Sequence, residues 1–420
     1  MSDHPCRYDF PMPLLQPLIG LIGLLAIAWL ISSNRVSIRW RPVLVGLLLQ
    51  WILAFLILKT KLGQNFFDGA QSVFTALIGF AYEGARTVVG EEALGLAGGA
   101  PMLAIIVLVS VIFFSSLFAV LHHLGIVRLV VGVMARLMSK TMGTSGAEST
   151  SAAANIFVGQ TEAPLLIRPY INKMTTSEIG AVMTVGFATV AGGVFAVYIT
   201  MMQGAVPGIA GHLLAASVMS APMGLAMAKV VFPETGTPET IGADISQPKS
   251  EYANTVDAAA SGAGDGMRLA LNILGMLIAF LGLLELFNAG LGWIYEGTTL
   301  QGLLGKVFAP IAWLLGIPSG ETAQVGSLLG TKLAVNEYVA FRELIDLSND
   351  TVAPISERSR IIASYALCGF ANVGSIAIQI GGLGGICPER RGEIARLGIR
   401  AMFAGALASF TTAATAAIFI

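Results

Sequence analysis

Long apolar runs separated by short polar stretches fill most of the chain, and their lengths predict its architecture. A helix needs roughly 20 apolar residues to cross the hydrocarbon core of a bilayer. Apolar runs of this kind, with few or no charges, predict eight membrane-spanning helices, at about 12–31, 42–58, 101–121, 179–201, 205–231, 267–291, 360–381 and 397–419. The pattern therefore predicts an all-α polytopic membrane protein.

Four further apolar segments are too short, or too often interrupted by Gly, Pro and polar residues, to cross a bilayer cleanly. We interpret residues 125–140 and 302–317 as interfacial helices. Residues 144–170 and 319–342 are expected to form re-entrant helical hairpins, because non-helical backbone at membrane depth is tolerated only inside protein or beside a water-filled cavity. These hairpins would carry polar groups into the membrane.

Composition agrees with a bilayer as the solvent. Hydrophobic residues make up 55% of the 420 residues and charged residues 12%, against about 25% charged in an ordinary soluble domain. The net charge of -1 argues against a nucleic-acid partner, which requires a concentrated field of Lys and Arg. The scattered cysteines Cys6, Cys368 and Cys387 are expected to be packing residues. No pairing of a nucleophile with a base suggests an enzyme, and no cofactor is expected.

A heptapeptide occurs twice. Residues 186–192, Gly-Phe-Ala-Thr-Val-Ala-Gly, return as residues 369–375, Gly-Phe-Ala-Asn-Val-Gly-Ser. When each span counts as one crossing and the hairpin at 319–342 as none, the two copies run in opposite directions. Such an inverted repeat places two discontinuous helices near the bilayer midplane, where many secondary transporters bind substrate and coupling ion. An extra crossing at 302–317 would instead make the repeats parallel.

The tip of the first hairpin carries three polar side chains in a row, Gln160, Thr161 and Glu162, between a glycine and a proline. Their donors and acceptors could bind a flat polar ligand. A solvent-exposed turn is the alternative, but an ionisable group between membrane-embedded runs is costly and therefore favours a functional role.

The second hairpin carries a single carboxylate, Glu337, in the apolar run 335–341. A binding role is favoured for the same reason as in the first hairpin. The structural alternative is a salt bridge from Glu337 to Lys332 or Arg342.

The two heptapeptides add groups that could coordinate a cation. Their Gly and Ala residues permit local unwinding, which exposes backbone carbonyl oxygens. Thr189 and Asn372 occupy equivalent positions and could each supply a side-chain oxygen. Asn372 and Ser375 would share one helical face, and Phe370 could lie against a flat ring. A helix interface of small residues is the alternative interpretation.

These segments resemble the concentrative nucleoside transporter family in order and spacing. The resemblance is carried by residues 159–164, 336–341 and 369–375, and it extends over the whole chain. It points to a bacterial member with three peripheral helices before the core. It implies a multi-pass protein of the bacterial inner membrane that forms a homotrimer. It also implies a scaffold domain and a mobile transport domain, with elevator-type alternating access driven by a sodium or proton gradient.

The resemblance also assigns residues. It puts Gln160, Thr161 and Glu162 at the nucleobase, Glu337, Asn372 and Ser375 at the ribose, and Val194 and Phe370 on the apolar side of the pocket.

The family's sodium site resembles the surroundings of Asn155 and Thr189, with backbone carbonyls of Val158 and Val190 completing it. Oxygen ligands suit a hard cation, and the absence of a carboxylate suits an ion that must be released. Proton coupling, the alternative, would use a buried carboxylate that can carry a proton, Glu162 or Glu337.

Elementary chemistry agrees with a nucleoside. Its base presents donors and acceptors along one edge, and its vicinal ribose hydroxyls can both donate to one carboxylate. An anionic substrate would instead require Arg or Lys in the hairpins. The sequence therefore predicts a sodium-driven nucleoside symporter. The alternatives are a proton-coupled symporter and a gate or channel-like protein that recognises nucleosides without ion coupling.

Lys and Arg in the short loops predict that both termini lie outside. The expected regions are peripheral scaffold helices in 1–122, a first repeat in 123–231, a cytoplasmic linker in 232–266, a long scaffold span in 267–301 and a second repeat in 302–420.

Overall fold

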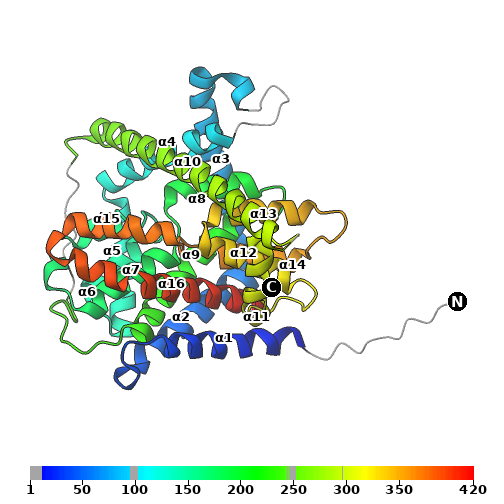
Figure 1. Ribbon diagram of the computed structural model, residues 1–420. Helices are drawn as coiled ribbons and strands as arrows, with labels where there is room; N and C mark the ends of the chain where they lie inside the picture. The colour runs from blue at the N-terminus through cyan, green and yellow to red at the C-terminus, as the bar shows by residue number, and fades with distance from the viewer. Residues whose placement is uncertain (1–11, 95–102, 244, 246–251, 296) are drawn as a thin grey trace.

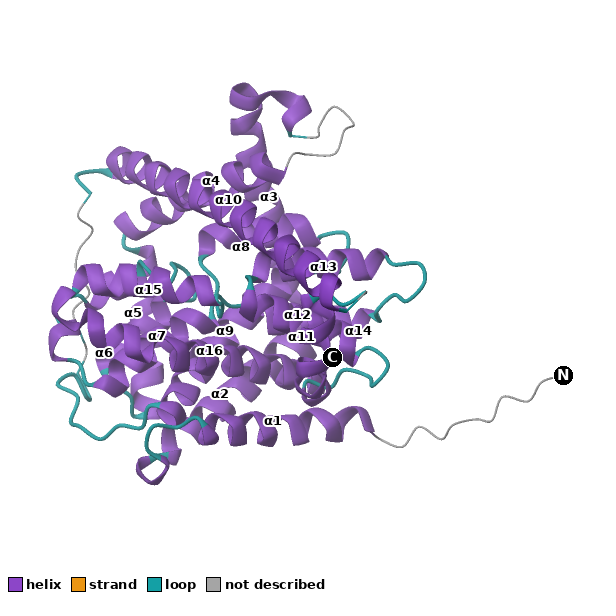
Figure 2. Ribbon diagram, viewed as in Figure 1, coloured by secondary structure: helices purple, strands orange, loops and turns teal. Residues whose placement is uncertain are grey.

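The computed structural model describes residues 12–94, 103–243, 245, 252–295 and 297–420, and their regular elements are helices. A single isolated β-bridge joins Ser145 to Ile241 within these residues. Figure 1 shows α1 (Met12–Leu30) along one side of the bundle and α10 (Thr255–Ile294) across the other, with α16 (Arg391–Phe419) between them. Short loops connect most of the helices (Figure 2).

The first part of the chain contains α2 (Trp40–Lys59), α3 (Lys61–Ala93) and α4 (Leu103–His123). Helix α3 was not expected from the sequence, because its polar residues keep its hydropathy below that of a membrane span. Thr60 caps this helix by accepting a hydrogen bond from the backbone N–H of Gly63. The helix packs against α9 (Ile209–Val231), where Phe67 fills the space above Gly211.

The first repeat begins with α5 (Ile126–Met142), at the position of the first expected interfacial helix. The first hairpin segment has one regular arm and one irregular arm. Its elements, and those that follow, are α6 (Gly146–Ala154), the 3₁₀ turns Ala163–Ile167 and Ile171–Lys173, α7 (Thr176–Ala188), α8 (Gly192–Met202) and α9.

The segment expected to form the second repeat has a similar order of elements, with a full helix where the first has two 3₁₀ turns and with a 3₁₀ turn before its last helix. It contains α11 (Leu300–Leu314), α12 (Thr322–Ala334), α13 (Glu337–Asn349), α14 (Glu357–Leu367), α15 (Val373–Ile386), a 3₁₀ turn Pro388–Arg390 and α16. The expected spans 179–201 and 360–381 are each divided into two helices, and each division falls in a copy of the heptapeptide. The prediction of two discontinuous helices is confirmed.

The number of long apolar helices differs from the eight expected spans. Among the described residues, 6 helices are long and apolar enough to cross a membrane: Trp40–Lys59, Ala104–His123, Thr176–Met202, Ile209–Val231, Thr255–Ile294 and Pro388–Phe419. The expected span 360–381 is not among them; its residues divide between the short helices α14 and α15, which are separated by a longer break than the one within Thr176–Met202. The described part of α1 forms a shorter apolar helix, Leu15–Leu30. A multi-pass membrane architecture is nevertheless evident.

Helix α10 begins at Thr255, well before the position near 267 that the sequence suggests. The stretch 253–266, interpreted from its Gly and Ala content as part of a flexible linker, therefore largely belongs to this helix. Asn254 caps the helix by accepting from the N–H of Asp257. Gly262 and Gly266 lie against α4 so closely that a Cβ at either position would approach its backbone within 3 Å. The small residues serve close helix packing.

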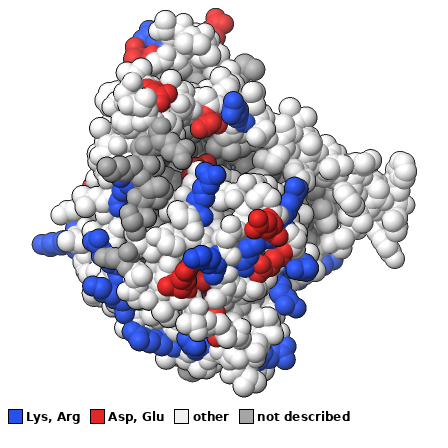
Figure 3. Space-filling view, turned by 90° about the vertical axis from the view of Figure 1, so that its left-hand side faces the viewer, with Lys and Arg blue, Asp and Glu red and all other residues white. Residues whose placement is uncertain are grey.

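The outer surface of the bundle suits contact with lipid. Several large apolar side chains of α10 remain exposed, among them Leu271, Ile278, Leu286 and Trp293. The face shown in Figure 3 has broad uncharged areas between scattered Lys, Arg, Asp and Glu side chains. Exposed apolar surface on this scale is expected where hydrocarbon replaces water.

The two helix breaks meet inside the bundle, beside the buried helix α16. The backbone N–H of Phe370 donates to the carbonyl oxygen of Thr189 at 3.3 Å. Gly369 next to it has φ +132, and a Cβ there would lie 2.8 Å from the carbonyl oxygen of Phe187. Only glycine combines this backbone conformation with so close an approach. The breaks are thus joined through their backbones.

Candidate functional site

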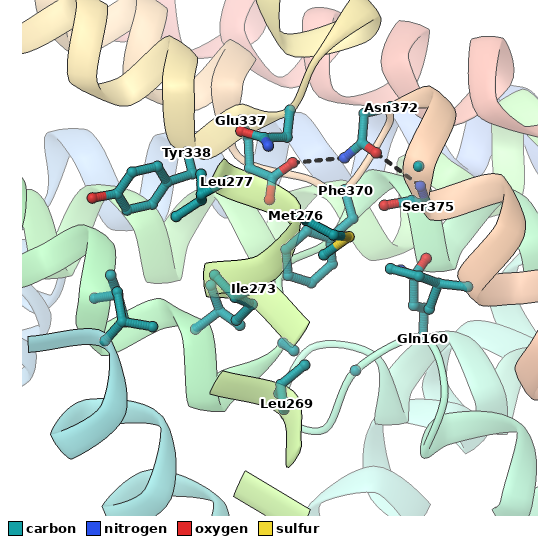
Figure 4. A pocket seen from close by; sticks show the side chains of 18 of the residues that line it. Gln160, Leu269, Ile273, Met276, Leu277, Glu337, Tyr338, Phe370, Asn372 and Ser375 are labelled. Atoms are coloured by element: carbon teal, nitrogen blue, oxygen red, sulfur yellow. Dashed lines mark hydrogen bonds between the residues drawn. The ribbon is translucent and has the colours of Figure 1, made fainter. Parts of the chain in front are cut away.

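The polar tips of both hairpin segments and the second helix break surround one cavity. It contains about 860 Å³ of empty space, including the part open to the outside. All eight residues expected to contact a nucleoside line it: Gln160, Thr161, Glu162, Val194, Glu337, Phe370, Asn372 and Ser375. Figure 4 shows Glu337, Asn372 and Ser375 along one side of this cavity and Gln160 below them. Residues far apart in the sequence therefore converge on one site.

Glu337 is the polar centre of the cavity. It lies in the first turn of α13 with only 6% of its surface exposed. One carboxylate oxygen accepts from the Tyr198 hydroxyl at 2.7 Å, and the other accepts from Nδ2 of Asn372 at 2.8 Å. These contacts fix the carboxylate while leaving lone pairs on both oxygens for a ligand.

The salt bridge considered for Glu337 is not formed. Nζ of Lys332 instead donates to the carbonyl oxygen of Ala366 at 2.7 Å, near the C-terminal end of α14. Arg342 points away and pairs with Asp346 at 3.4 Å. The structural alternative for this carboxylate is therefore wrong.

Asn372 owes its orientation to a helix cap. It is the N-cap residue of α15, and its Oδ1 accepts from the backbone N–H of Ser375 at 2.8 Å (Figure 4). Because a backbone N–H can only donate, this bond fixes the amide oxygen on that side. The Asn372 nitrogen is then directed to Glu337, so a local feature of the helix start positions a functional group.

The tip of the first hairpin segment packs directly against the start of α8. Gly159 has φ +151, and a Cβ there would lie 2.6 Å from a Glu162 carboxylate oxygen and 2.8 Å from the Ala191 Cβ. Gln160, which follows, is 8% exposed, and its Oε1 accepts from Nε2 of Gln379 at 2.9 Å. The strained glycine thus allows the Gln160–Glu162 tip to approach α8 closely.

Apolar residues complete the cavity. Helix α10 crosses it and contributes Leu269, Ile273, Met276, Leu277 and Phe280 (Figure 4). Val194 and Phe370 add to this apolar lining, as expected. Among the described lining residues there is no Lys, Arg or His, so the cavity suits a neutral ligand with several polar groups and an apolar face.

Sequence reasoning missed three contributors to the site: Tyr198, Gln379 and the apolar face of α10. Each of the two polar residues lies one helical turn after an expected site residue, Val194 and Ser375 respectively. A lone polar residue at that spacing in an apolar helix was the signal that could have found them. No signal distinguished α10 from the other apolar helices.

The expected cation ligands lie beside the cavity. Asn155 is fully buried, and its Nδ2 donates to the carbonyl oxygen of Ser151 at 3.0 Å, while its Oδ1 has no hydrogen-bond partner. The Thr189 hydroxyl donates to the carbonyl oxygen of Val185 at 2.9 Å and keeps its lone pairs. A bond of 3.1 Å from Gly192 N to Phe157 O joins the two segments.

These groups fit a hard cation. An unpaired buried oxygen beside an unwound helix is a suitable ligand for an ion such as sodium. Val158 and Val190 lie in the same two segments, at 155–158 and 189–191. Within the described residues, no group of three or more His, Cys, Asp and Glu could hold a metal ion.

The expected packing role of the cysteines agrees with their positions. Cys368 and Cys387 are buried and free, whereas Cys6 lies outside the described residues.

Comparisons with known families cover most of the chain. The family model described as Na+ dependent nucleoside transporter C-terminus matches residues 212–417, and its N-terminal counterpart matches residues 19–92. A third model, described as nucleoside recognition, matches residues 104–205. The last of these contains the first hairpin tip and the first helix break.

Individual proteins agree with this result. The nucleoside permease NupC of Helicobacter pylori is 40% identical over 97% of this chain and 98% of its own. The transporter CNTnw, in an inward-facing substrate-bound state, superposes with a TM-score of 0.91 and 41% identity, over 97% of this chain and 98% of its own.

A doubly substituted variant of CNTnw in an outward-facing state gives a TM-score of 0.89 at 40% identity, over 97% of this chain and 98% of that one. The matches therefore extend over nearly the full length in sequence and in structure. The chain belongs to the family of concentrative, Na+-dependent nucleoside transporters.

Proposed function

We propose that this protein imports nucleosides across the bacterial inner membrane by symport with sodium. The observation that carries the proposal is the cavity in which Glu337, held by Tyr198 and Asn372, lies with Gln160 and an apolar lining. This is a binding site for a neutral molecule that has a polar sugar at one end and a flat base at the other.

The ribose binds at the end formed by Glu337, Asn372 and Ser375. The carboxylate retains free lone pairs that can accept from the two vicinal hydroxyls, and hydrogen bonds to a charged acceptor are the stronger kind. Asn372 already uses its oxygen as a helix cap and donates to Glu337, so its main role is to hold the carboxylate in place.

The nucleobase binds at the end formed by Gln160, Thr161 and Glu162. The donors and acceptors of this tip match the polar edge of a base. Phe370 and Val194, with α10 opposite, provide apolar contact for its faces.

Sodium binds beside the cavity, at the side-chain oxygens of Asn155 and Thr189 and the carbonyls of Val158 and Val190. The unpaired Oδ1 of Asn155 supports this assignment. The matching family models are of Na+ dependent nucleoside transporters, which supports sodium over a proton.

Transport proceeds by elevator-type alternating access of a transport domain against a scaffold, in a homotrimer. The similar transporter CNTnw has inward-facing and outward-facing structures, which supports alternating access. The similar order of elements before and after α10, with a break in each half, supports an inverted repeat built around two re-entrant hairpins.

The test is uptake of radiolabelled uridine by the purified protein in proteoliposomes. We expect saturable accumulation that requires an inward sodium gradient and is lost when choline replaces sodium at several pH values. If accumulation depends on a proton gradient instead, the coupling ion is the proton and not sodium. Equilibration without any gradient dependence would favour a gate or channel-like protein.

A further inference from the structure

Gln379 occupies a position behind the cavity that points to a role in selecting the base. It lies on α15 and is 1% exposed. Its Nε2 donates to two acceptors, Oε1 of Gln160 at 2.9 Å and the backbone carbonyl of Met183 at 3.0 Å. Gln379 therefore connects the first hairpin tip with α7 and α15.

The Met183 carbonyl determines which way both amides face. A backbone carbonyl can only accept a hydrogen bond, so the nitrogen of Gln379 must lie on that side. The same nitrogen faces Gln160, which must present its oxygen in return. The Gln160 nitrogen is then left for a ligand, since no other protein group in the described part of the chain bonds this side chain.

The first heptapeptide leaves room for this pair. A Cβ at Gly186 would lie 2.8 Å from Nε2 of Gln379 and 3.0 Å from the Cβ of Gln160. Any larger residue at this position would push the two amides apart. The pair of glutamines is therefore part of the packing of α7 against α15.

We propose that Gln379 is a positioning residue that holds Gln160 as a hydrogen-bond donor toward the nucleobase. The inference rests on the proposed function, because it concerns the base end of the same cavity. A donor at this point favours bases with a carbonyl oxygen over bases with an amino group at the same ring position. An amino group would face the Gln160 nitrogen and leave two donors unpaired.

The test compares nucleosides in which a ring carbonyl beside an N–H is replaced by an amino group beside an unprotonated ring nitrogen. Uridine and cytidine form one such pair, and inosine and adenosine form the corresponding purine pair. Inhibition of radiolabelled uridine uptake into proteoliposomes, under a sodium gradient, gives the ratio of inhibition constants within each pair. We expect wild-type protein to prefer the carbonyl member of at least one pair.

The Gln379→Glu variant is the decisive change. An ionised carboxylate has no donor, and a protonated one has a single donor that the Met183 carbonyl engages. In both forms it presents an acceptor to Gln160, which must turn its nitrogen toward position 379 and its oxygen into the cavity. We expect the ratio to shift toward the amino member by about tenfold, the scale of one matched hydrogen bond replaced by an unpaired group.

The Gln379→Met variant is the matched control without charge. It keeps most of the volume and imposes no orientation on Gln160, so we expect the preference to fall toward equality. It also provides the readout if the Glu variant does not fold.

Three outcomes would overturn the proposal. Equal loss of affinity for all four nucleosides would make Gln379 a structural residue only, and unchanged ratios in both variants would remove it from selection altogether. Wild-type protein that accumulates none of the four nucleosides would refute the proposed function, and this inference with it. If the wild-type protein transports nucleosides but the variants leave the ratios of inhibition constants unchanged, this inference alone is refuted.

Discussion

The two helix breaks start from nearly the same heptapeptide and present different chemistry. The first runs over 189–191, between α7 and α8, and the residue before α8, Ala191, has no side-chain cap to offer. The second runs over 368–372, and Asn372 caps the helix that follows it. The fourth position of the motif is Thr189 in the first copy and Asn372 in the second, and the proposed function assigns these residues to the cation and the ribose respectively.

The comparison shows how a duplicated element can acquire two roles. Both copies retain the small residues that let the helix unwind, so both place polar groups at the same depth. In the first copy the available groups are a hydroxyl and backbone oxygens near the unpaired oxygen of Asn155. In the second copy the amide is tied to Glu337. Both breaks interrupt a helix, but the second begins earlier relative to its heptapeptide, and the side chains that the two breaks present differ.

The largest expected effect is at the second break. Glu337→Gln replaces a carboxylate oxygen by a nitrogen that cannot accept from Tyr198, Asn372 or a ribose hydroxyl. Uridine affinity should fall by about 100-fold or more, since each hydrogen bond to a charged acceptor contributes about 1.5–3 kcal/mol. Isothermal titration calorimetry of the purified protein measures the affinity for uridine. Glu357→Gln, an exposed change outside the cavity, is the control, and unchanged affinity in Glu337→Gln would remove the ribose assignment.

At the first break the expected effect is on sodium. Asn155→Ala removes the buried oxygen that has no protein partner. The sodium concentration for half-maximal uptake should rise by about tenfold, because one ligand of a weak cation site is lost. At saturating sodium the KM for uridine should stay near its original value. A rise in the uridine KM alone, with sodium dependence intact, would contradict the division of roles.

Asn372 combines a helix cap with a contact to Glu337, and two substitutions separate these functions. Asn372→Ala should lower stability by about 1 kcal/mol through the lost cap, and raise the uridine KM several-fold. Asn372→Ser restores a capping oxygen but cannot reach Glu337 with a donor amide. It should recover thermal stability while the KM stays raised. Parallel recovery of both quantities would mean that Asn372 acts through the helix alone.

The smallest expected effect on uptake is at Thr189. Thr189→Ser retains the hydroxyl, so the sodium dependence of uptake should stay within about twofold of the original. Thr189→Val has a similar shape and no oxygen, and it should require several-fold more sodium. Measuring uptake over a range of sodium concentrations compares the sodium dependence of the two variants. Identical behaviour of the two variants would exclude the hydroxyl as a ligand.

Local signals in the sequence were sufficient for the breaks and for the polar cavity residues, because Gly, Pro and polar side chains in membrane-length runs are rare and costly. Val194 was assigned only by the family resemblance. Local signals were insufficient for α3 and for the first turns of α10. There, polar or small residues resemble loops until a neighbouring helix covers them, as α4 covers Gly262 and Gly266. The helical spacing of Tyr198 and Gln379 could have marked them as candidates, but their partners Glu337 and Gln160 come from distant segments, so their contacts could not be predicted.

The backbone bond from Phe370 to Thr189 gives the two proposed sites a direct physical connection. It joins a residue of the nucleoside cavity to a ligand of the proposed sodium site, so a shift at either break is transmitted to the other. If occupation of one site tightens the other by some factor, reciprocity demands the same factor in the opposite direction. Sodium then strengthens nucleoside binding by the same factor by which nucleoside strengthens sodium binding. The contact between the two unwound helices is the place where a substitution should change this factor.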